Sequence, residues 1–149
     1  MHQPPPATAG ICPSDDRLQG LRWQTIGQRY TLKAHTEACM CVETEWDPGA
    51  AIPPHRHARH DEFAYVLEGE FELLLDGQTV VAREGDTVRI PRGTAHAVFN
   101  KSQGLARALM WTTPSLDLFA LFARADGVED PTAVMALCSE YDFEFLPPA

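Results

Sequence analysis

The chain is short of basic residues and of long apolar runs. Its 149 residues include 12 Lys and Arg against 21 Asp and Glu, which gives a formal net charge of −9 at pH 7. Phosphates are usually met by clustered Lys and Arg, so the absence of any basic run predicts no nucleic-acid partner. No apolar run is long enough to span a bilayer, and the N-terminus has no charged segment followed by an apolar stretch. The sequence therefore predicts a cytoplasmic protein without a membrane partner.

The four cysteines lack the paired spacing of a zinc knuckle or a disulfide framework. They are Cys12, Cys39, Cys41 and Cys138, and reduced thiols are expected at each. Cys39 and Cys41 would share one face of a strand, where they could line a pocket or lie in the core. Because a free cysteine behaves as a small buried hydrophobe, the core is favoured.

Three common catalytic signatures are also missing. The chain has no GxSxG elbow, no GxxxxGK phosphate loop and no GxGxxG turn. A nucleophilic Cys/His pair is the weaker remaining option, since nothing in the sequence places Cys39 or Cys41 beside a base.

Two stretches, residues 49–69 and 85–100, hold the recognisable chemistry. Two histidines in the first stretch are two positions apart, so on a strand they point to the same face and can bind one ion together. A glutamate in the same stretch and a histidine in the second can join them if neighbouring strands lie alongside. Three imidazoles and one carboxylate suit one divalent ion of iron, nickel, manganese, zinc, cobalt or copper. The predicted ligands are His55, His57, Glu62 and His96.

The two stretches resemble the two motifs of the cupin family, GxxxxxHxHxxxxExxxxxxG and GxxxxxPxGxxHxxxN. Every fixed position is met in order: Gly49, His55, His57, Glu62 and Gly69, then Gly85, Pro91, Gly93, His96 and Asn100. The resemblance covers about residues 39–112. It implies an antiparallel β-barrel, also described as a double-stranded β-helix or jelly roll, with one metal ion inside.

The rest of the chain fits a single domain in three parts. Residues 1–16 lack periodicity and predict a flexible N-terminal arm. Residues 17–113 contain short strand-forming runs between turn signals, which is typical of an all-β barrel or sandwich. Residues 114–149 change to helical spacing and predict two C-terminal α-helices packed on the barrel. The ending resembles the tail of small cupins similar to bacterial quercetin dioxygenase-like proteins.

The helical extension has predicted starts and faces. Thr113-Pro114 is expected to cap and open the first helix, and Gly127 to end it. Asp130-Pro131 is expected to open the second. Their apolar faces would consist of Leu116, Phe119, Ala120 and Ala123, and of Val134, Leu137, Cys138 and Tyr141. Phe119 and Phe122 could instead form a lid over the barrel, although plain packing is favoured.

Strand parity predicts the lining of the site. If Glu62 faces the metal, Ala64 and Val66 face inward as well, and Val98 joins His96. Such an apolar lining suits a planar organic compound or a hydrophobic acid. His60 could support a ligand, contact substrate or lie in a solvated loop, and the loop is favoured. Rim arginines could bind an anion but are expected to be solvated; they are Arg83, Arg89 and Arg92.

Two classes of function remain. The resemblance to quercetinase-like cupins implies a metal-dependent dioxygenase acting on a small enolic or aromatic compound, with Glu62 as both metal ligand and catalytic base. The alternatives are a non-catalytic metal-containing protein that binds or senses a small molecule, and an isomerase or hydrolase using the same site. Cupins commonly pair through their sheets, and the outward aromatic residues Phe63, Tyr65 and Phe99 predict a homodimer.

Overall fold

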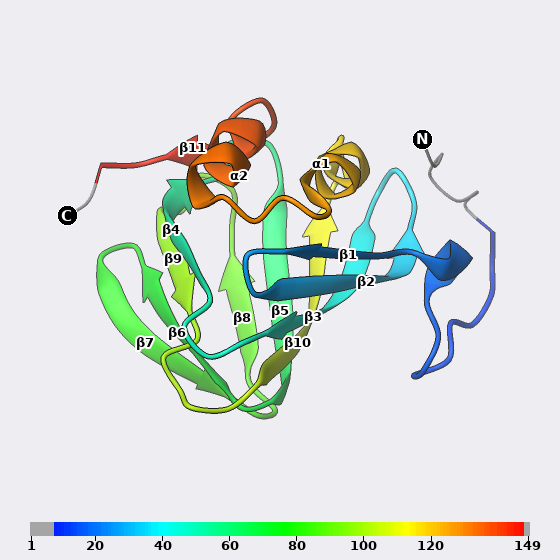
Figure 1. The fold of residues 1–149 in the computed structure, drawn as a ribbon, viewed down its shortest axis with the longest axis horizontal. Helices are drawn as coiled ribbons and strands as arrows, with labels where there is room; N and C mark the ends of the chain where they lie inside the picture. Colours follow the sequence, from blue (N-terminus) through cyan, green and yellow to red (C-terminus); the bar gives the residue numbers. More distant parts are fainter. Residues whose placement is uncertain (1–7, 148–149) are drawn as a thin grey trace.

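A computed structural model describes residues 8–147 of the protein, which fold into two antiparallel sheets packed face to face, with two short helices at one end (Figure 1). The first sheet has the order β1-β2-β3-β10-β5-β8 and the second β11-β4-β9-β6-β7. The six strands of the first sheet are β1 (Arg22–Thr25), β2 (Gln28–His35), β3 (Met40–Trp46), β10 (Ala106–Thr113), β5 (Asp61–Glu68) and β8 (Thr87–Ile90). Those of the second are β11 (Glu144–Phe145), β4 (Ala51–Arg56), β9 (His96–Phe99), β6 (Glu70–Leu75) and β7 (Gln78–Arg83).

The mostly antiparallel β architecture and the two helices agree with the predicted fold class, but the two sheets do not close into one hydrogen-bonded barrel. The chain passes from β7 in one sheet to β8 in the other through a turn at Gly85, whose φ is +87°. At such a crossing, side chains rather than backbone groups fill the space between the sheets. The arrangement is a two-layered jelly roll.

Alternating burial explains why these segments are strands. Along β3 every second residue is buried, namely Met40, Val42, Thr44 and Trp46. Trp46 packs between the sheets, where it meets Phe71 of β6 edge-on with ring centroids 5.7 Å apart. Met40 and Val42 pack in a second core, which includes residues of the first helix. Cys41 lies on the opposite, outer face and Cys39 in the turn before β3, and both are half-buried. The expectation that both thiols share one strand face in the core is therefore wrong. Cys39 precedes the strand, and the neighbours of Cys41, Met40 and Val42, take the inner positions.

The first helix, α1 (Leu118–Ala125), begins later than predicted. β10 continues to Thr113, which is still paired with Asp61, so the chain is extended where the helix was expected to start. Ser115 then donates from its backbone N–H and its hydroxyl to the carbonyl of Glu37, and Asp117 is the N-cap. The buried face also differs from the prediction and consists of Leu118, Phe119, Leu121 and Ala125.

The second helix, α2 (Pro131–Cys138), begins where the sequence predicted. The Asp130 carboxylate accepts a hydrogen bond of 3.2 Å from the backbone N–H of Ala133, the usual N-cap arrangement. Val134 is buried, and Leu137, Cys138 and Tyr141 pack around the core beneath α1. That core is centred on Trp23, which stacks on Phe122 and meets Phe119 edge-on.

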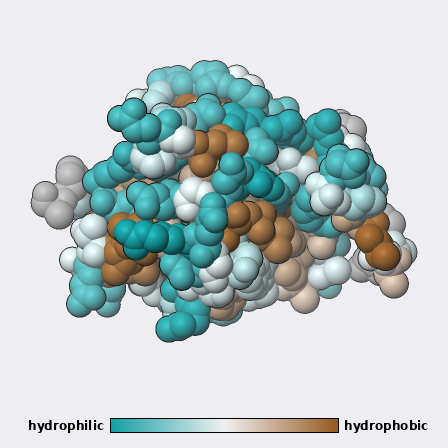
Figure 2. Space-filling model, turned by 90° about the horizontal axis from the view of Figure 1, so that it is seen from below, coloured by the Kyte–Doolittle hydropathy of each residue, from teal (hydrophilic) through white to brown (hydrophobic). Residues whose placement is uncertain are grey.

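The outer surface is largely polar. Figure 2 shows the end opposite the helices as a mostly hydrophilic face on which the apolar groups are separated. On β5, Tyr65 and Leu67 are exposed, and Phe63 stacks on Trp111 of β10, so the predicted outward parity of this strand is correct. Within residues 8–147, neither α1 nor α2 is long and apolar enough to cross a membrane.

Candidate metal centre

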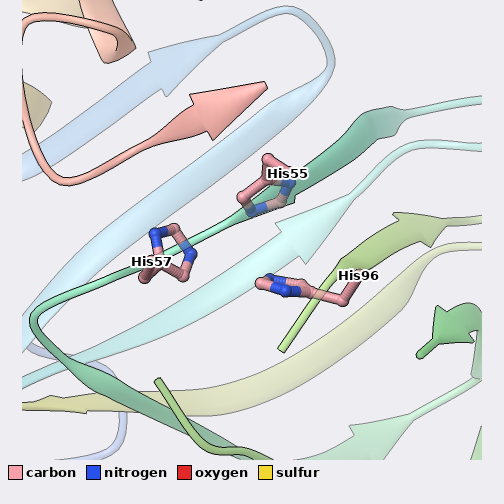
Figure 3. A group of neighbouring side chains, drawn as sticks. All are labelled: His55, His57 and His96. Carbon is pink, nitrogen blue, oxygen red and sulfur yellow. The ribbon is translucent and has the colours of Figure 1, made fainter. Parts of the chain in front are cut away.

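Three histidines meet between the two sheets. His55 lies near the end of β4 and is paired in register with His96, the first residue of β9, and His57 follows two positions after His55. Their potential ligand nitrogens all lie within 4.8 Å of one another. The three rings point toward a common centre (Figure 3), and each residue is at most 3% exposed.

The backbone fixes which nitrogen each ring presents. The Nδ1 atoms of His55, His57 and His96 lie 2.8, 2.7 and 2.9 Å from the carbonyl oxygens of Pro53, Asp142 and Thr94. A carbonyl can only accept, so each Nδ1 carries the proton and each Nε2 keeps its lone pair. This is the arrangement in which histidines bind a metal ion.

Glu62 of β5 reaches the same centre from the opposite sheet. Its Oε2 lies 3.2 Å from Nε2 of His96 and 3.9 Å from Nε2 of His57, and its side chain is 17% exposed. Despite that proximity, the buried Nε2 of His96 makes no hydrogen bond. A buried polar atom without a partner is costly, and a cation bound to the lone pair of this Nε2 would satisfy it. The donor set therefore fits a transition-metal ion.

The charges of the site suit a cation as well. Burial raises the pKa of Glu62, but its contacts with His96 and His57 outweigh burial and bring that pKa down to about 2. Burial, reinforced by the neighbouring imidazoles, lowers the pKa of His55 to about 3, and burial also lowers the pKa of His57. At neutral pH Glu62 is thus a carboxylate and His55 and His57 are neutral imidazoles, the forms that ligate metals. Burial lowers the pKa of His96, but its contact with Glu62 outweighs burial and raises that pKa.

His60 is not the solvated loop residue that was favoured from the sequence. It is 1% exposed, its Nδ1 lies 2.8 Å from Oδ2 of Asp142, and its ring lies against that of His57 with centroids 4.2 Å apart. His60 therefore takes the supporting position that was the alternative. Asp142 itself was missed, because nothing in its local sequence links it to a motif more than 80 residues earlier.

The C-terminal segment covers the histidines. β11 pairs with β4 through Phe145 and His55, and the backbone N–H of Leu146 donates to the carbonyl of Pro54 at 2.9 Å. Phe143 lies against both His55 and His57. Two of the three histidines are thus walled by residues from the end of the chain.

A cavity of about 140 Å³ runs from the histidines into the space between the sheets. Its apolar lining includes the three residues predicted from parity, Ala64, Val66 and Val98. Phe122 also lines it, whereas Phe119 packs in the core. Gln28 and Tyr30 add a buried polar pair, in which the Tyr30 hydroxyl donates to Gln28 Oε1. Neither residue was predicted to line the site, because this part of the sequence has only a weak alternating pattern.

The rim arginines are surface residues. Arg83, Arg89 and Arg92 are all exposed, and none lines the cavity. Arg92 pairs with Asp61 at 3.2 Å and Arg83 lies 3.6 Å from Glu70. The interpretation as solvated side chains agrees with these positions.

Residues 42–112 match the model of the cupin domain family. The pectin degradation protein KdgF of Dickeya dadantii is 30% identical over 84 residues, an alignment that covers 55% of this chain and 76% of that protein. This chain belongs to the cupin family. Cupins typically bind a metal ion, and the clustered histidines of this cupin lie within the matched residues.

Two solved structures show how far the likeness extends. KdgF from a Halomonas species superposes with a TM-score of 0.65 at 28% identity, covering 75% of this cupin and 99% of that chain. The polyketide cyclase RemF from Streptomyces resistomycificus superposes with a TM-score of 0.55 at 25% identity, covering 60% and 66%. The family thus includes enzymes of several kinds, and the likeness does not select dioxygenase chemistry among them.

Proposed function

We propose that this cupin is a metal-dependent enzyme that oxidises a small enolic or aromatic compound with dioxygen. The observation that carries the proposal is the juxtaposition of three Nε2 atoms and an ionised carboxylate with an apolar cavity. Polar groups bind and activate the substrate at one end, while the apolar walls accept its body.

His55, His57, His96 and Glu62 would hold the ion. Bound there, a divalent ion would supply Lewis acidity, which acidifies an enol or phenol, and a template for the second reactant. The backbone carbonyls of Pro53, Asp142 and Thr94 keep the three rings in the tautomer that this requires.

Glu62 is the proposed base. It is ionised in the resting site, so Oε2 can accept the proton that the substrate hydroxyl loses. Oε2 lies 3.2 Å from Nε2 of His96, at the same end of the cavity as the three histidines. Ala64, Val66 and Val98 exclude water from the reacting end, which strengthens every charge interaction there.

A second candidate is isomerisation or cyclisation without oxygen at the same site. It is favoured by the names of the related proteins, a pectin degradation protein and a polyketide cyclase. The apolar lining supports an aromatic or enolic substrate over a sugar acid. A metal-containing cupin that binds a small molecule without turnover is the third candidate.

One experiment separates these candidates. Protein purified without an affinity tag is analysed for metals, then loaded with iron, nickel, manganese, cobalt, copper or zinc and given a panel of enols, phenols and diketones in air and under nitrogen. We expect oxygen uptake in proportion to substrate loss, with isotope-labelled oxygen recovered in the product. Equal turnover under nitrogen would favour an isomerase or cyclase. A compound that binds tightly and is recovered unchanged with every metal would favour a binding protein.

We also propose that this cupin forms a homodimer. Phe63 and Tyr65 on the outer face of β5, with Leu67 and the neighbouring Trp111, form the surface on which two copies would pair into a homodimer. Phe99, the third residue of the predicted set, lies on β9 in the other sheet. A cytoplasmic location and the division into residues 1–16, 17–113 and 114–149 stay predictions from the sequence; residues 1–7, within the expected arm, lie outside the described part of the chain.

A further inference from the structure

Asp142 contacts the histidine segment through both its main chain and its side chain. It lies between α2 and β11, far along the chain from the cupin motifs. Its carbonyl oxygen is 2.7 Å from Nδ1 of His57, and its carboxylate reaches the three residues that follow His57. The side chain is 9% exposed, and its partner His60 is buried, whereas Ala58 and Arg59 lie at the surface.

The main-chain contact acts on the ring of His57 directly. Because the Asp142 carbonyl can only accept a hydrogen bond, it selects the tautomer with the proton on Nδ1 and leaves the lone pair on Nε2. It also sets the rotation of the ring. The other two histidines obtain the same restraint from Pro53 and Thr94, each two residues before its own histidine. Only His57 depends on a distant segment for it.

The side-chain contact fixes where that carbonyl lies. Oδ1 accepts from the backbone N–H of Ala58 at 3.1 Å, and Oδ2 accepts from the N–H of Arg59 at 2.9 Å and from Nδ1 of His60 at 2.8 Å. Three donors thus converge on one carboxylate. An amide has a single acceptor oxygen, so asparagine could not accept from donors on both sides.

We infer that Asp142 is a positioning residue for the metal centre: its carboxylate fastens the C-terminal segment to residues 58–60, and this places its own carbonyl against Nδ1 of His57. The inference rests on the proposed function, since it assumes that Nε2 of His57 binds the ion. It explains why His60 is buried although it is not one of the clustered histidines, because His60 is one of the three donors that hold the carboxylate.

The test compares Asp142→Ala, Asp142→Asn and the control Glu144→Ala. Glu144 is an acid in the same segment whose side chain is 66% exposed and pairs with Arg56 at the surface, so its loss removes charge without touching the site. Two quantities are measured in each folded variant. One is the affinity for Co²⁺ and Zn²⁺ by titration, with the visible spectrum of the Co²⁺ form. The other is the ¹⁵N spectrum of the histidine rings in metal-free protein, which reports the tautomer of His57.

We expect Asp142→Ala to bind metal about 10 to 100-fold more weakly, as for loss of other groups that orient a metal ligand, and to show mixed tautomers at His57. Asp142→Asn should lie between it and the wild type, and Glu144→Ala should match the wild type. If Asp142→Ala does not fold, metal affinity and the histidine ring spectrum are measured on Asp142→Asn, and these two results decide whether Asp142 positions His57. A loss of thermal stability alone does not change the tautomer of a folded protein, so the ring spectrum separates positioning from general stabilisation.

The failure of this inference differs from the failure of the proposed function. Wild-type affinity and an unchanged His57 spectrum in both Asp142 variants would overturn the positioning role and leave the metal centre standing. A wild-type protein that binds no metal would overturn the proposed function. In that case the ring spectrum alone tests the role of Asp142, and mixed tautomers of His57 in Asp142→Ala would still support it.

Discussion

The ring of Phe143 stacks on the imidazole of His55, with centroids 5.2 Å apart and planes inclined by 19°. The same ring meets His57 edge-on at 4.4 Å. Phe143 comes from the segment before β11, and the two histidines from the end of β4, so this contact joins the C-terminal segment to the centre of the site. Because Phe143 also lines the cavity, a substitution there tests whether this wall contacts a bound compound.

Replacing Phe143 by Leu should lower the free energy of unfolding by about 0.5–1.5 kcal/mol, because apolar burial is largely kept while the aromatic contacts are lost. Chemical denaturation measures this. Phe63→Leu is the matched control, since Phe63 also stacks on an aromatic ring, Trp111, but on the outer face of the sheet. Only Phe143→Leu should also weaken the binding of aromatic compounds. Equal affinity of the two variants for aromatic compounds would show that Phe143 does not contact the bound compound.

His57→Ala should abolish stoichiometric metal binding, because Nε2 of His57 is one of the three clustered nitrogens. His60→Ala should keep nearly one ion per chain, since Nδ1 of His60 faces Asp142 and His60 is not part of the cluster. Elemental analysis of the two variants side by side checks this. Equal metal content in wild type and His57→Ala would show that the ligand assignment is wrong.

Glu62→Gln should retain part of the metal, which three histidines still hold, and lose about 10² to 10⁴-fold in turnover, because the amide cannot accept a proton. Glu68→Gln on the same strand is the control, since Glu68 pairs with Arg107 at the surface. Single-turnover kinetics on the metal-loaded variants give the comparison. Unchanged turnover in Glu62→Gln would exclude Glu62 as the base.

Light scattering at micromolar concentration should give the mass of a homodimer. A stable interface of this kind buries more than about 1,000 Å². Tyr65→Asp should shift it to the monomer, because a carboxylate would be placed in an apolar contact. Val81→Asp on β7 offers an equally exposed apolar position in the other sheet and should leave the mass unchanged. A monomeric wild type would refute the pairing.

Alkylation of Cys41 should be slow at pH 8 and increase about tenfold per pH unit up to roughly pH 11. Burial, with the nearby Cys39, raises the pKa of the Cys41 thiol from 9.0 to about 11. The thiolate is the reactive form, so raising the pKa lowers its population at every pH below the new value. At pH 8 the rate should be about 100-fold lower than for a thiol of pKa 9. Peptide mass spectrometry after timed iodoacetamide treatment measures it, and a rate that levels off near pH 9 would contradict the shift.

Features that depend on local geometry could be predicted from the sequence. Spacing by two placed His55 and His57 together, and parity placed Ala64 and Val66 in the cavity with Tyr65 outside, because alternate side chains of a strand point to opposite faces. The Asp130-Pro131 cap of α2 could also be predicted, because a cap and its helix are neighbours in the chain.

Contacts between distant segments could not be predicted from local patterns. The continuation of β10 through Thr113 is set by its pairing with Asp61, and this moved the start of α1 beyond the position that local signals favoured. Asp142 and Phe143 reach the histidines because the C-terminal segment packs along β4. Periodicity arises from the backbone of one element and is written in the sequence, whereas contacts between elements depend on how the whole chain buries its surface.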